Sequence, residues 1–352
     1  MDKKYLRIYN GIKNEIISGG FSNGQKLPSK RTIAEKEDVS LITVEHAYDI
    51  LKSEGYIESC ERSGFYVTYN EGEMYYTGGR AETEVKGKEI RSAESDERFP
   101  FSVYERIVRS VINDYGEKIL DKSPNSGIEE LKTAIRKYLM RNRDITVENE
   151  QIIIGSGAEH LYGMIIELLG RNLIYGIEEP SYEQIENVYS AQGVKYEKLT
   201  LSSEGIRTSD LRKSVASVLH VTPYRSYPTG VTATVSKKKE YLRWANERNG
   251  YLIEDDYESE FSVLKKNEET LFGEDESERV IYVNTFSKTI SPSLRTGYML
   301  LPKRLVKDFY IRLGFYSCTV PMLEQYIIAD LLNDGSFERH LNRIRRERRK
   351  KL

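Results

Sequence analysis

The sequence predicts a multidomain chain, in which a small unit of helices and a two-stranded hairpin precedes a larger α/β domain with a mostly parallel sheet. The chain has 352 residues, which is more than one ordinary domain needs and enough for two or three. Residues 1–69 carry helical apolar stripes that glycines interrupt. From Phe99 onward, helical stripes alternate with short apolar strands, a pattern typical of parallel sheets.

Composition excludes several classes of protein. The net charge of −2 gives no chain-wide basic surface. Two cysteines, Cys60 and Cys318, argue against a disulfide framework and fit a reducing cytosol. The chain shows no apolar run of membrane length and no signal-peptide pattern. We therefore expect a cytoplasmic protein without a membrane partner, and we predict no metal site.

The first predicted helix covers Tyr5–Ser18. Ile8, Ile12 and Ile16 recur there every four residues and form one apolar stripe. Gly19 and the glycines that follow it end the pattern. This stripe predicts a helix packed against a small core.

Two further helices and a hairpin follow. One helix starts after Pro28, and the next begins behind Ser40, a good N-cap, and runs to about Ser53. The inner face of the latter helix carries Val44, Ala47, Tyr48 and Leu51. A polar tip at Glu61–Gly64 then joins the short strands Tyr56-Ile57 and Phe65–Val67. Helix, helix-turn-helix and wing is a DNA-reading order.

The segment LPSKRTIAEKEDVSLITVEHAYDILKSEGYI resembles the winged-helix domain of the GntR family, and the match covers roughly residues 5–68. The resemblance implies DNA contacts at the start of the second helix, at the start of the recognition helix and at the wing tip. The implied residues are Lys26, Ser29, Lys30, Arg31, Ser40, Leu41, Thr43, Val44, Ser63 and Gly64. Leu41 departs from the family, which often has arginine there, the usual reader of guanine. A small winged helix used for protein contacts is the alternative.

The rest of the chain divides into a linker and a larger domain. Residues 70–98 are polar, dotted with glycine and rich in both charges, which predicts a flexible linker. The larger domain covers residues 99–352. Its predicted strands are Ile152–Ile154, Leu173–Tyr175, Val218–Val221, Tyr251–Ile253 and Val280–Val283, with a helix at Leu161–Leu169. Ligand groups in such sheets gather at the carboxyl ends of the strands.

Two motifs at strand ends, IEDDYESEF and FSKTISPSLRTGY, supply the groups that a pyridoxal 5'-phosphate (PLP) pocket needs. Lys288 is predicted to form the Schiff base and Asp255 to keep the pyridine nitrogen protonated. Tyr257 is predicted to contact the ring oxygen and Arg295 to bind the phosphate. The neighbouring Asp256 has no assigned role and could cap a helix.

The order of these motifs resembles fold-type I aminotransferases and, behind a GntR-like unit, the MocR subfamily of GntR-type transcriptional regulators. The resemblance covers about residues 99–350. It implies that Thr285 or Ser287 donates a hydroxyl to the phosphate and that Tyr182 stacks on the ring. Backbone N–H groups at Gly157 and Ala158 would face the phosphate from a helix N-terminus.

Three departures from the family stand out. Glu159 replaces a common glutamine, and a carboxylate near a phosphate is unfavourable unless it turns outward or is paired. Tyr227 stands where aminotransferases usually have asparagine, which favours a role other than efficient transamination. The sequence ends at Leu352 without most of the family's C-terminal small domain, so we expect impaired substrate capture but largely unaffected cofactor binding.

These features predict a DNA-binding transcriptional regulator whose PLP-binding domain senses a small amino compound. By the resemblance, the protein is a homodimer on a double-stranded DNA operator. One alternative is an aminotransferase that retains a DNA-binding unit for regulation. Another is a domain without PLP that only dimerises the DNA-binding unit. Sustained turnover of an amino acid and a keto acid would support the first alternative. Absence of a visible absorbance band from the cofactor would support the second.

Overall fold

The computed structural model describes residues 4–60, 63–69, 97–263 and 269–351. The chain divides into two compact units, Met1–Ile90 and Arg91–Leu352. The predicted linker at 70–98 lies outside the described residues except for Glu97 and Arg98, and so does part of the predicted wing tip. Within the described ranges, no helix is long and apolar enough to cross a membrane, and no group of side chains could hold a metal ion.

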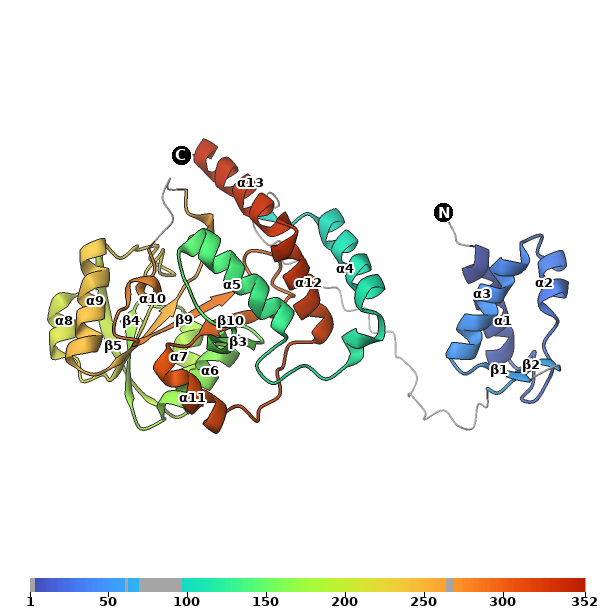
Figure 1. Ribbon diagram of the computed structural model, residues 1–352, viewed down its shortest axis with the longest axis horizontal. Coiled ribbons are helices and arrows are strands. Elements are labelled where there is room, and N and C mark those ends of the chain that lie inside the picture. The colour runs from blue at the N-terminus through green and yellow to red at the C-terminus, as the bar shows by residue number, and fades with distance from the viewer. Residues whose placement is uncertain (1–3, 61–62, 70–96, 264–268, 352) are drawn as a thin grey trace. The chain divides into compact units, whose positions relative to one another are not determined.

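The N-terminal unit packs three helices against an antiparallel hairpin (Figure 1). Its elements are α1 (Lys4–Ile17), α2 (Lys30–Lys36), α3 (Leu41–Ser53), β1 (Ile57–Cys60) and β2 (Gly64–Val67). The apolar stripe of α1 is buried, as predicted. Ser40 caps α3, because its hydroxyl accepts a hydrogen bond from the Thr43 backbone N–H at 3.3 Å. The predicted winged helix-turn-helix is thus confirmed.

The larger unit is built on an eight-stranded sheet with the order β3-β10-β9-β8-β7-β4-β5-β6. The strands are β3 (Ile152–Gly155), β4 (Ile174–Glu179), β5 (Lys195–Ser202), β6 (Gly205–Ile206), β7 (Val218–Val221), β8 (Tyr251–Asp255), β9 (Val280–Thr285) and β10 (Gly297–Leu300). Strands β5, β4, β7, β8 and β9 run parallel, while β10 is antiparallel to both neighbours. The predicted mostly parallel sheet is confirmed.

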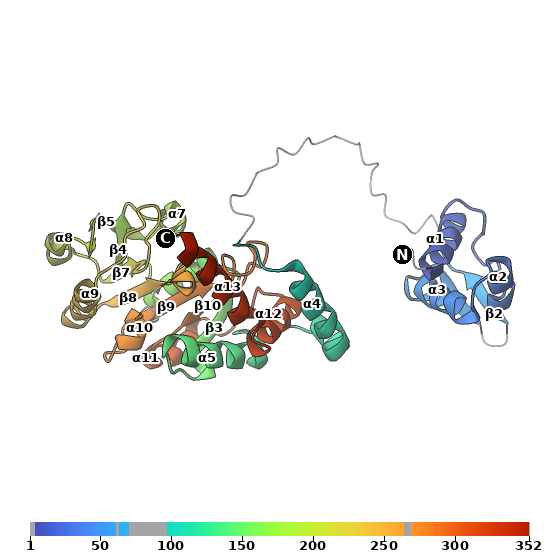
Figure 2. The same ribbon diagram turned by 90° about the horizontal axis from the view of Figure 1, so that it is seen from above.

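Helices cover both faces of the sheet. They are α4 (Phe101–Tyr115), η3 (Gly116–Leu120), α5 (Glu129–Arg143), η4 (Asn149–Gln151), α6 (Ala158–Leu169), α7 (Glu183–Ala191), α8 (Thr208–Lys213), α9 (Val235–Glu247), η5 (Ser259–Phe261), α10 (Leu271–Glu274), α11 (Lys303–Arg312), α12 (Met322–Asn333) and α13 (Ser336–Lys351). In both views α8 and α9 lie at one end of the sheet, and α4 and α12 lie at the other (Figures 1 and 2).

The alternation of side chains along β10 shows how the two faces are filled. Tyr298 and Leu300 join the core under α5 and α12, whereas Met299 joins the core under α6 and α11. Sequence patterns missed β10 and β5. The first lies inside the FSKTISPSLRTGY motif and its continuation, and the second alternates charged with apolar residues near the sheet edge.

Candidate cofactor site and DNA-binding surface

A cavity of about 240 Å³ lies at the carboxyl ends of β8 and β9. Of the predicted cofactor residues, those that line it are Tyr182, Ala158, Asp255, Tyr257, Thr285, Ser287, Lys288 and Arg295. Gly157 lies directly beside it, since a Cβ built there would be 3.0 Å from Arg295 Nη2. Because adjacent parallel strands end at one edge of the sheet, groups from two distant motifs meet in one cavity.

Asp255 is a carboxylate without a strong counterion. Its side chain is 14% exposed, and it has no lysine or arginine partner in the described part of the chain. Its Oδ2 accepts a 2.5 Å hydrogen bond from the Tyr162 hydroxyl, and His220 Nε2 lies 3.9 Å away. Burial lowers the pKa of His220 to about 3, so the imidazole is neutral at pH 7 and forms no ion pair with Asp255 despite this distance.

The pKa of Asp255 reflects this buried environment, in which no cation from the described residues lies beside the carboxylate. Burial raises it to about 6, although the hydrogen bond from Tyr162 opposes the shift. At pH 7 the group is therefore an anion held in a place that disfavours its charge. A cationic ligand group beside it would stabilise that charge.

Lys288 enters the cavity from the turn after β9, and its side chain is 43% exposed. Its Nζ lies 3.2 Å from Glu258 Oε1. Burial opposes the charge of the amine, but Tyr257 and Glu258 outweigh this effect and raise the pKa of Lys288. Glu258 also lies 3.7 Å from Arg348 Nη1 on α13 and 3.8 Å from Arg225 Nη1. The Lys288 amine is thus held by Glu258, and this carboxylate has two further cationic neighbours, Arg348 and Arg225.

Another part of the site joins Arg295 to the N-terminus of α6. Gly157 is the N-cap of this helix and has φ +95°, where glycine is favoured, and the absence of a Cβ lets the guanidinium approach. Arg295 Nη2 lies 2.6 Å from Glu159 Oε2. The helix N-terminus and the guanidinium both attract anions. In the structure the anion beside both of them is the Glu159 carboxylate. Glu159 is therefore paired, which is one of the two conditions under which a carboxylate is tolerated near a phosphate site.

Hydroxyl and aromatic groups complete the walls. The Ser287 hydroxyl donates to the Leu294 carbonyl oxygen at 3.4 Å, which turns it toward its own loop. Tyr182 is 40% exposed and meets Tyr227 edge-on, with ring centroids 6.1 Å apart and planes at 83°. These two rings give the cavity an aromatic side that suits a flat ligand.

Asp256 lines the same cavity and belongs to a buried hydrogen-bond network in its wall. Its Oδ2 accepts hydrogen bonds from Arg143 and from the Tyr282 hydroxyl. The Asn284 amide donates to the Tyr282 oxygen at 2.9 Å and to Glu260 Oε1 at 2.5 Å. Asp256 is therefore one half of a buried ion pair, and it does not cap a helix. The pair fixes the backbone that directly follows Asp255.

Sequence reasoning missed several residues of the site or beside it, among them Tyr162, His220 and Glu258. Tyr162 lies one turn after Ala158 on α6, and that spacing could have placed it on the same helix face. His220 interrupts the apolar strand β7 beside β8, which is an unusual place for a histidine. Glu258 has φ +67°, and nothing in the sequence signals that conformation.

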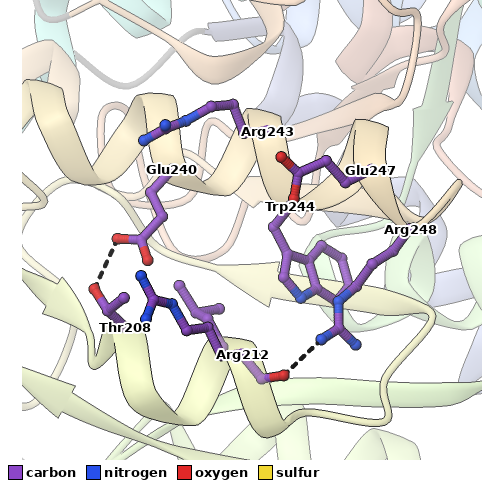
Figure 3. A pocket seen from close by; sticks show the side chains of 8 residues that line it. Thr208, Arg212, Glu240, Arg243, Trp244, Glu247 and Arg248 are labelled. Carbon is purple, nitrogen blue, oxygen red and sulfur yellow. Dashed lines mark hydrogen bonds between the residues drawn. The ribbon is translucent and has the colours of Figure 1, made fainter.

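A larger groove of about 440 Å³ lies on the surface between α8 and α9 (Figure 3). The residues that line it belong to these two helices or, in the case of Arg248, directly follow α9. The Thr208 hydroxyl donates to Glu240 at 3.0 Å, and Arg248 donates to the Arg212 carbonyl at 2.8 Å. These contacts join the two helices, so the smaller cavity at the strand ends remains the candidate site.

The start of α3 is the exposed part of the predicted DNA-binding surface. Leu41 is 44% exposed and Ile42, which the sequence interpretation passed over, is 77% exposed. Lys30 begins α2, and its Nζ lies 2.7 Å from Glu45 Oε1 on α3, so a phosphate would share the lysine with a carboxylate. Lys26 lies against the wing, because a Cβ at Gly64 would be 3.1 Å from Lys26 Cε. The other predicted contacts outside the core are Ser29, Arg31, Ser40, Thr43 and Ser63.

The prediction that Val44 contacts DNA is wrong. Its side chain is 0% exposed and packs in the core with Ala47, Tyr48 and Leu51. Val44 lies three, four and seven residues before Ala47, Tyr48 and Leu51, and this spacing puts it on the same inner face of α3. The apolar side chains that face outward at the start of α3 are those of Leu41 and Ile42.

Comparison with known proteins agrees with both units. Residues 4–67 match the family of bacterial regulatory proteins named gntR, and residues 99–352 match the aminotransferases of class I and II. The Bacillus subtilis protein YdeL, an uncharacterized HTH-type transcriptional regulator, is 31% identical over 99% of this chain and 77% of its own length.

Two further similarities extend this result. The probable rhizopine catabolism regulatory protein MocR of Rhizobium meliloti is 28% identical, over 97% of this chain and 74% of its own. The structure of LysN, an α-aminoadipate aminotransferase from Thermus thermophilus complexed with N-(5'-phosphopyridoxyl)-L-leucine, is 25% identical with a TM-score of 0.63. That similarity covers 70% of this chain and 64% of LysN, which is under two thirds of LysN. The chain belongs to the GntR-type transcriptional regulators of the MocR kind, in which a gntR helix-turn-helix unit precedes an aminotransferase-like domain.

Proposed function

We propose that this regulator binds PLP covalently at Lys288 and responds to a small amino compound that reaches the same cavity. The observation that carries the proposal is that Lys288, Asp255 and Arg295, from two motifs, line one cavity. When bound, PLP supplies an aldehyde to which amines attach reversibly. The related LysN structure holds a phosphopyridoxyl amino acid in the same fold.

The residues present fit this cofactor. Asp255 is a carboxylate that lacks a cation among the described residues, which suits a protonated pyridine nitrogen. Arg295 and the N-terminus of α6 form an anion site that suits the phosphate. Tyr182 and Tyr227 offer an aromatic wall to the ring. Each end of the ligand thus meets a group of opposite charge.

The chain's own residues also supply proton handling at the amine. An amine is a nucleophile only when it has lost its extra proton. Glu258 Oε1 lies 3.2 Å from Lys288 Nζ, within reach of that proton. Arg348 and Arg225 surround the same carboxylate, so the loss of its lysine partner would leave it with other cations. Glu258 is therefore the group that we assign to hold the protonated amine of Lys288 in the cavity.

The N-terminal unit would bind a double-stranded DNA operator. The exposed Leu41 and Ile42 at the start of α3 suit apolar contact with thymine methyl groups in the major groove. We further propose a homodimer, which would present two such helices to two half-sites. Large apolar side chains are exposed on the larger unit, with Phe101 at 75%, Leu120 at 81% and Phe315 at 70%, as expected of an unpaired dimer surface. A protein of this kind works in the cytoplasm.

Covalent trapping tests the proposal. The full chain is incubated with PLP, reduced with borohydride, digested and mapped by mass spectrometry. We expect one phosphopyridoxyl group on Lys288, its loss in Lys288→Ala, and its retention in Lys307→Ala, which removes an exposed lysine of α11. Label spread over surface lysines, or label unchanged in Lys288→Ala, would overturn the proposal. Candidate amines are then added to a complex with genomic DNA fragments, and a change in retention identifies the effector class.

A further inference from the structure

We infer that Glu159 sets the affinity of the site for phosphorylated ligands, because its carboxylate pairs with Arg295 and competes with the phosphate. This inference rests on the proposed binding of PLP. It assigns to Glu159 the role of keeping the phosphorylated ligand exchangeable with solution.

The geometry places three charged features at one point. Glu159 lies in the first turn of α6, and its Oε2 is 2.6 Å from Arg295 Nη2. The same Nη2 would be 3.0 Å from a Cβ on Gly157, the N-cap of the helix. The guanidinium, the helix N-terminus and the carboxylate therefore meet beside the cavity. An incoming phosphate would find the place already held by an anion.

The exposure of the pair decides how it acts. The side chains of Arg295 and Glu159 are 54% and 34% exposed. Ion pairs this open to water are weak, so a phosphate can displace the carboxylate from Arg295. The displaced carboxylate stays on the first turn of α6, where it repels a phosphate that carries up to two negative charges. Glu159 thus weakens phosphate binding without closing the site.

The effect is strongest at the phosphate end, because at Asp255 the charge of Glu159 only adds to burial, which is the main cause of the raised pKa of that carboxyl. Lys288 is held by a different carboxylate, Glu258, and Asp255 is held by Tyr162. Pyridoxal, the same aldehyde without the phosphate, would meet Lys288 and Asp255 alone. Replacing Glu159 should therefore change the affinity for PLP much more than the affinity for pyridoxal.

The chain contains a matched control on the same helix. Glu167 pairs with Arg171, and these side chains are 35% and 54% exposed, nearly the values of the Glu159–Arg295 pair. Glu167 is not among the described residues that line the cavity. Glu167→Gln thus removes an equivalent charge and an equivalent ion pair from α6 at a distance from the site.

The experiment compares the wild-type full chain with Glu159→Gln and Glu167→Gln. Visible absorbance titrations give the affinity of each for PLP and for pyridoxal at one pH and salt concentration. We expect Glu159→Gln to bind PLP roughly two- to fivefold more tightly, the size of one part-exposed charge interaction. Pyridoxal affinity should change far less than PLP affinity in Glu159→Gln, and Glu167→Gln should match the wild type with both ligands.

Two results would overturn the inference, and they can be told apart. If the wild type binds both aldehydes and Glu159→Gln binds PLP no more tightly, the competition does not exist although the proposed function stands. The same holds if pyridoxal affinity rises as much as PLP affinity. If none of the three proteins binds either aldehyde, the proposed function fails and this inference fails with it.

Discussion

Asparagine in place of Asp255 should stabilise the cofactor-free protein although it damages the cofactor site. The pKa of Asp255 is raised by burial from 3.8 to about 6. Between these values the folded state binds more protons than the unfolded state, so stability falls as the pH rises from about 4 to about 6. The loss is the difference of about 2 pKa units at about 1.4 kcal/mol each, or about 3 kcal/mol at neutral pH. The amide of the Asp255→Asn variant would avoid this cost while still accepting the Tyr162 hydrogen bond.

Trp244 provides an assay that is specific to the larger unit. It is the one tryptophan of the sequence, lies on α9 and is 5% exposed. Urea unfolding followed by its fluorescence would give the free energy of unfolding of that unit at pH 8 and at pH 5. We expect Asp255→Asn to raise it by about 1–3 kcal/mol at pH 8, with a smaller gain at pH 5, where part of the wild-type cost is already relieved.

The adjacent residue provides the contrast. Asp256→Asn breaks the buried pair with Arg143, so it should lower the free energy of unfolding by about 3–5 kcal/mol. Borohydride trapping of PLP should meanwhile weaken in Asp255→Asn. If Asp255→Asn destabilised the larger unit as Asp256→Asn does, or if its gain were independent of pH, the carboxylate would not be strained in the cofactor-free fold and the reasoning would be refuted.

Two further predictions concern DNA binding and catalysis. Ile42→Ala should lower operator affinity by about 1 kcal/mol, and on an operator with uracil in place of thymine the variant and the wild type should bind equally. Val44→Ala should instead destabilise the N-terminal unit by about 2 kcal/mol, and this loss would be measured as faster hydrogen exchange in α3 of the full chain. Equal effects of the two variants on affinity and exchange would contradict these assignments. An amino acid and a keto acid should yield no product beyond one equivalent per site, and sustained turnover measured by chromatography would favour the aminotransferase alternative.

Local signals explain how much could be predicted from the sequence. The Ser40 cap and the apolar stripe after it predict α3 at the residues where the structure has it, because capping and helical periodicity act within a few residues. The strand Val218–Val221 was predicted with its observed bounds for a similar reason. Lys288 and Asp255 could be placed in one cavity because adjacent parallel strands end on the same side of a sheet.

The unpredicted features depend on contacts between distant segments. The Tyr162–Asp255 hydrogen bond joins residues 93 positions apart, and no local pattern encodes it. β10 inserts antiparallel between β3 and β9, although its four buried residues look like the tail of a loop motif. For Val44 the prediction relied on a local motif and was wrong. The motif places Val44 at the start of the recognition helix but does not say which face of the helix it lies on, and the structure buries it.

The charges of the cavity indicate what kind of ligand the site suits. Its two cations already have acidic partners, Lys288 with Glu258 and Arg295 with Glu159. Its anion Asp255 has no cation among the described residues. A ligand that carries only a negative charge must displace a carboxylate, whereas a ligand with a cationic ring gains an unopposed ion pair at Asp255. Binding should therefore depend chiefly on the ring end, with the phosphate end adjusting the affinity, which is an arrangement suited to a receptor whose occupancy changes.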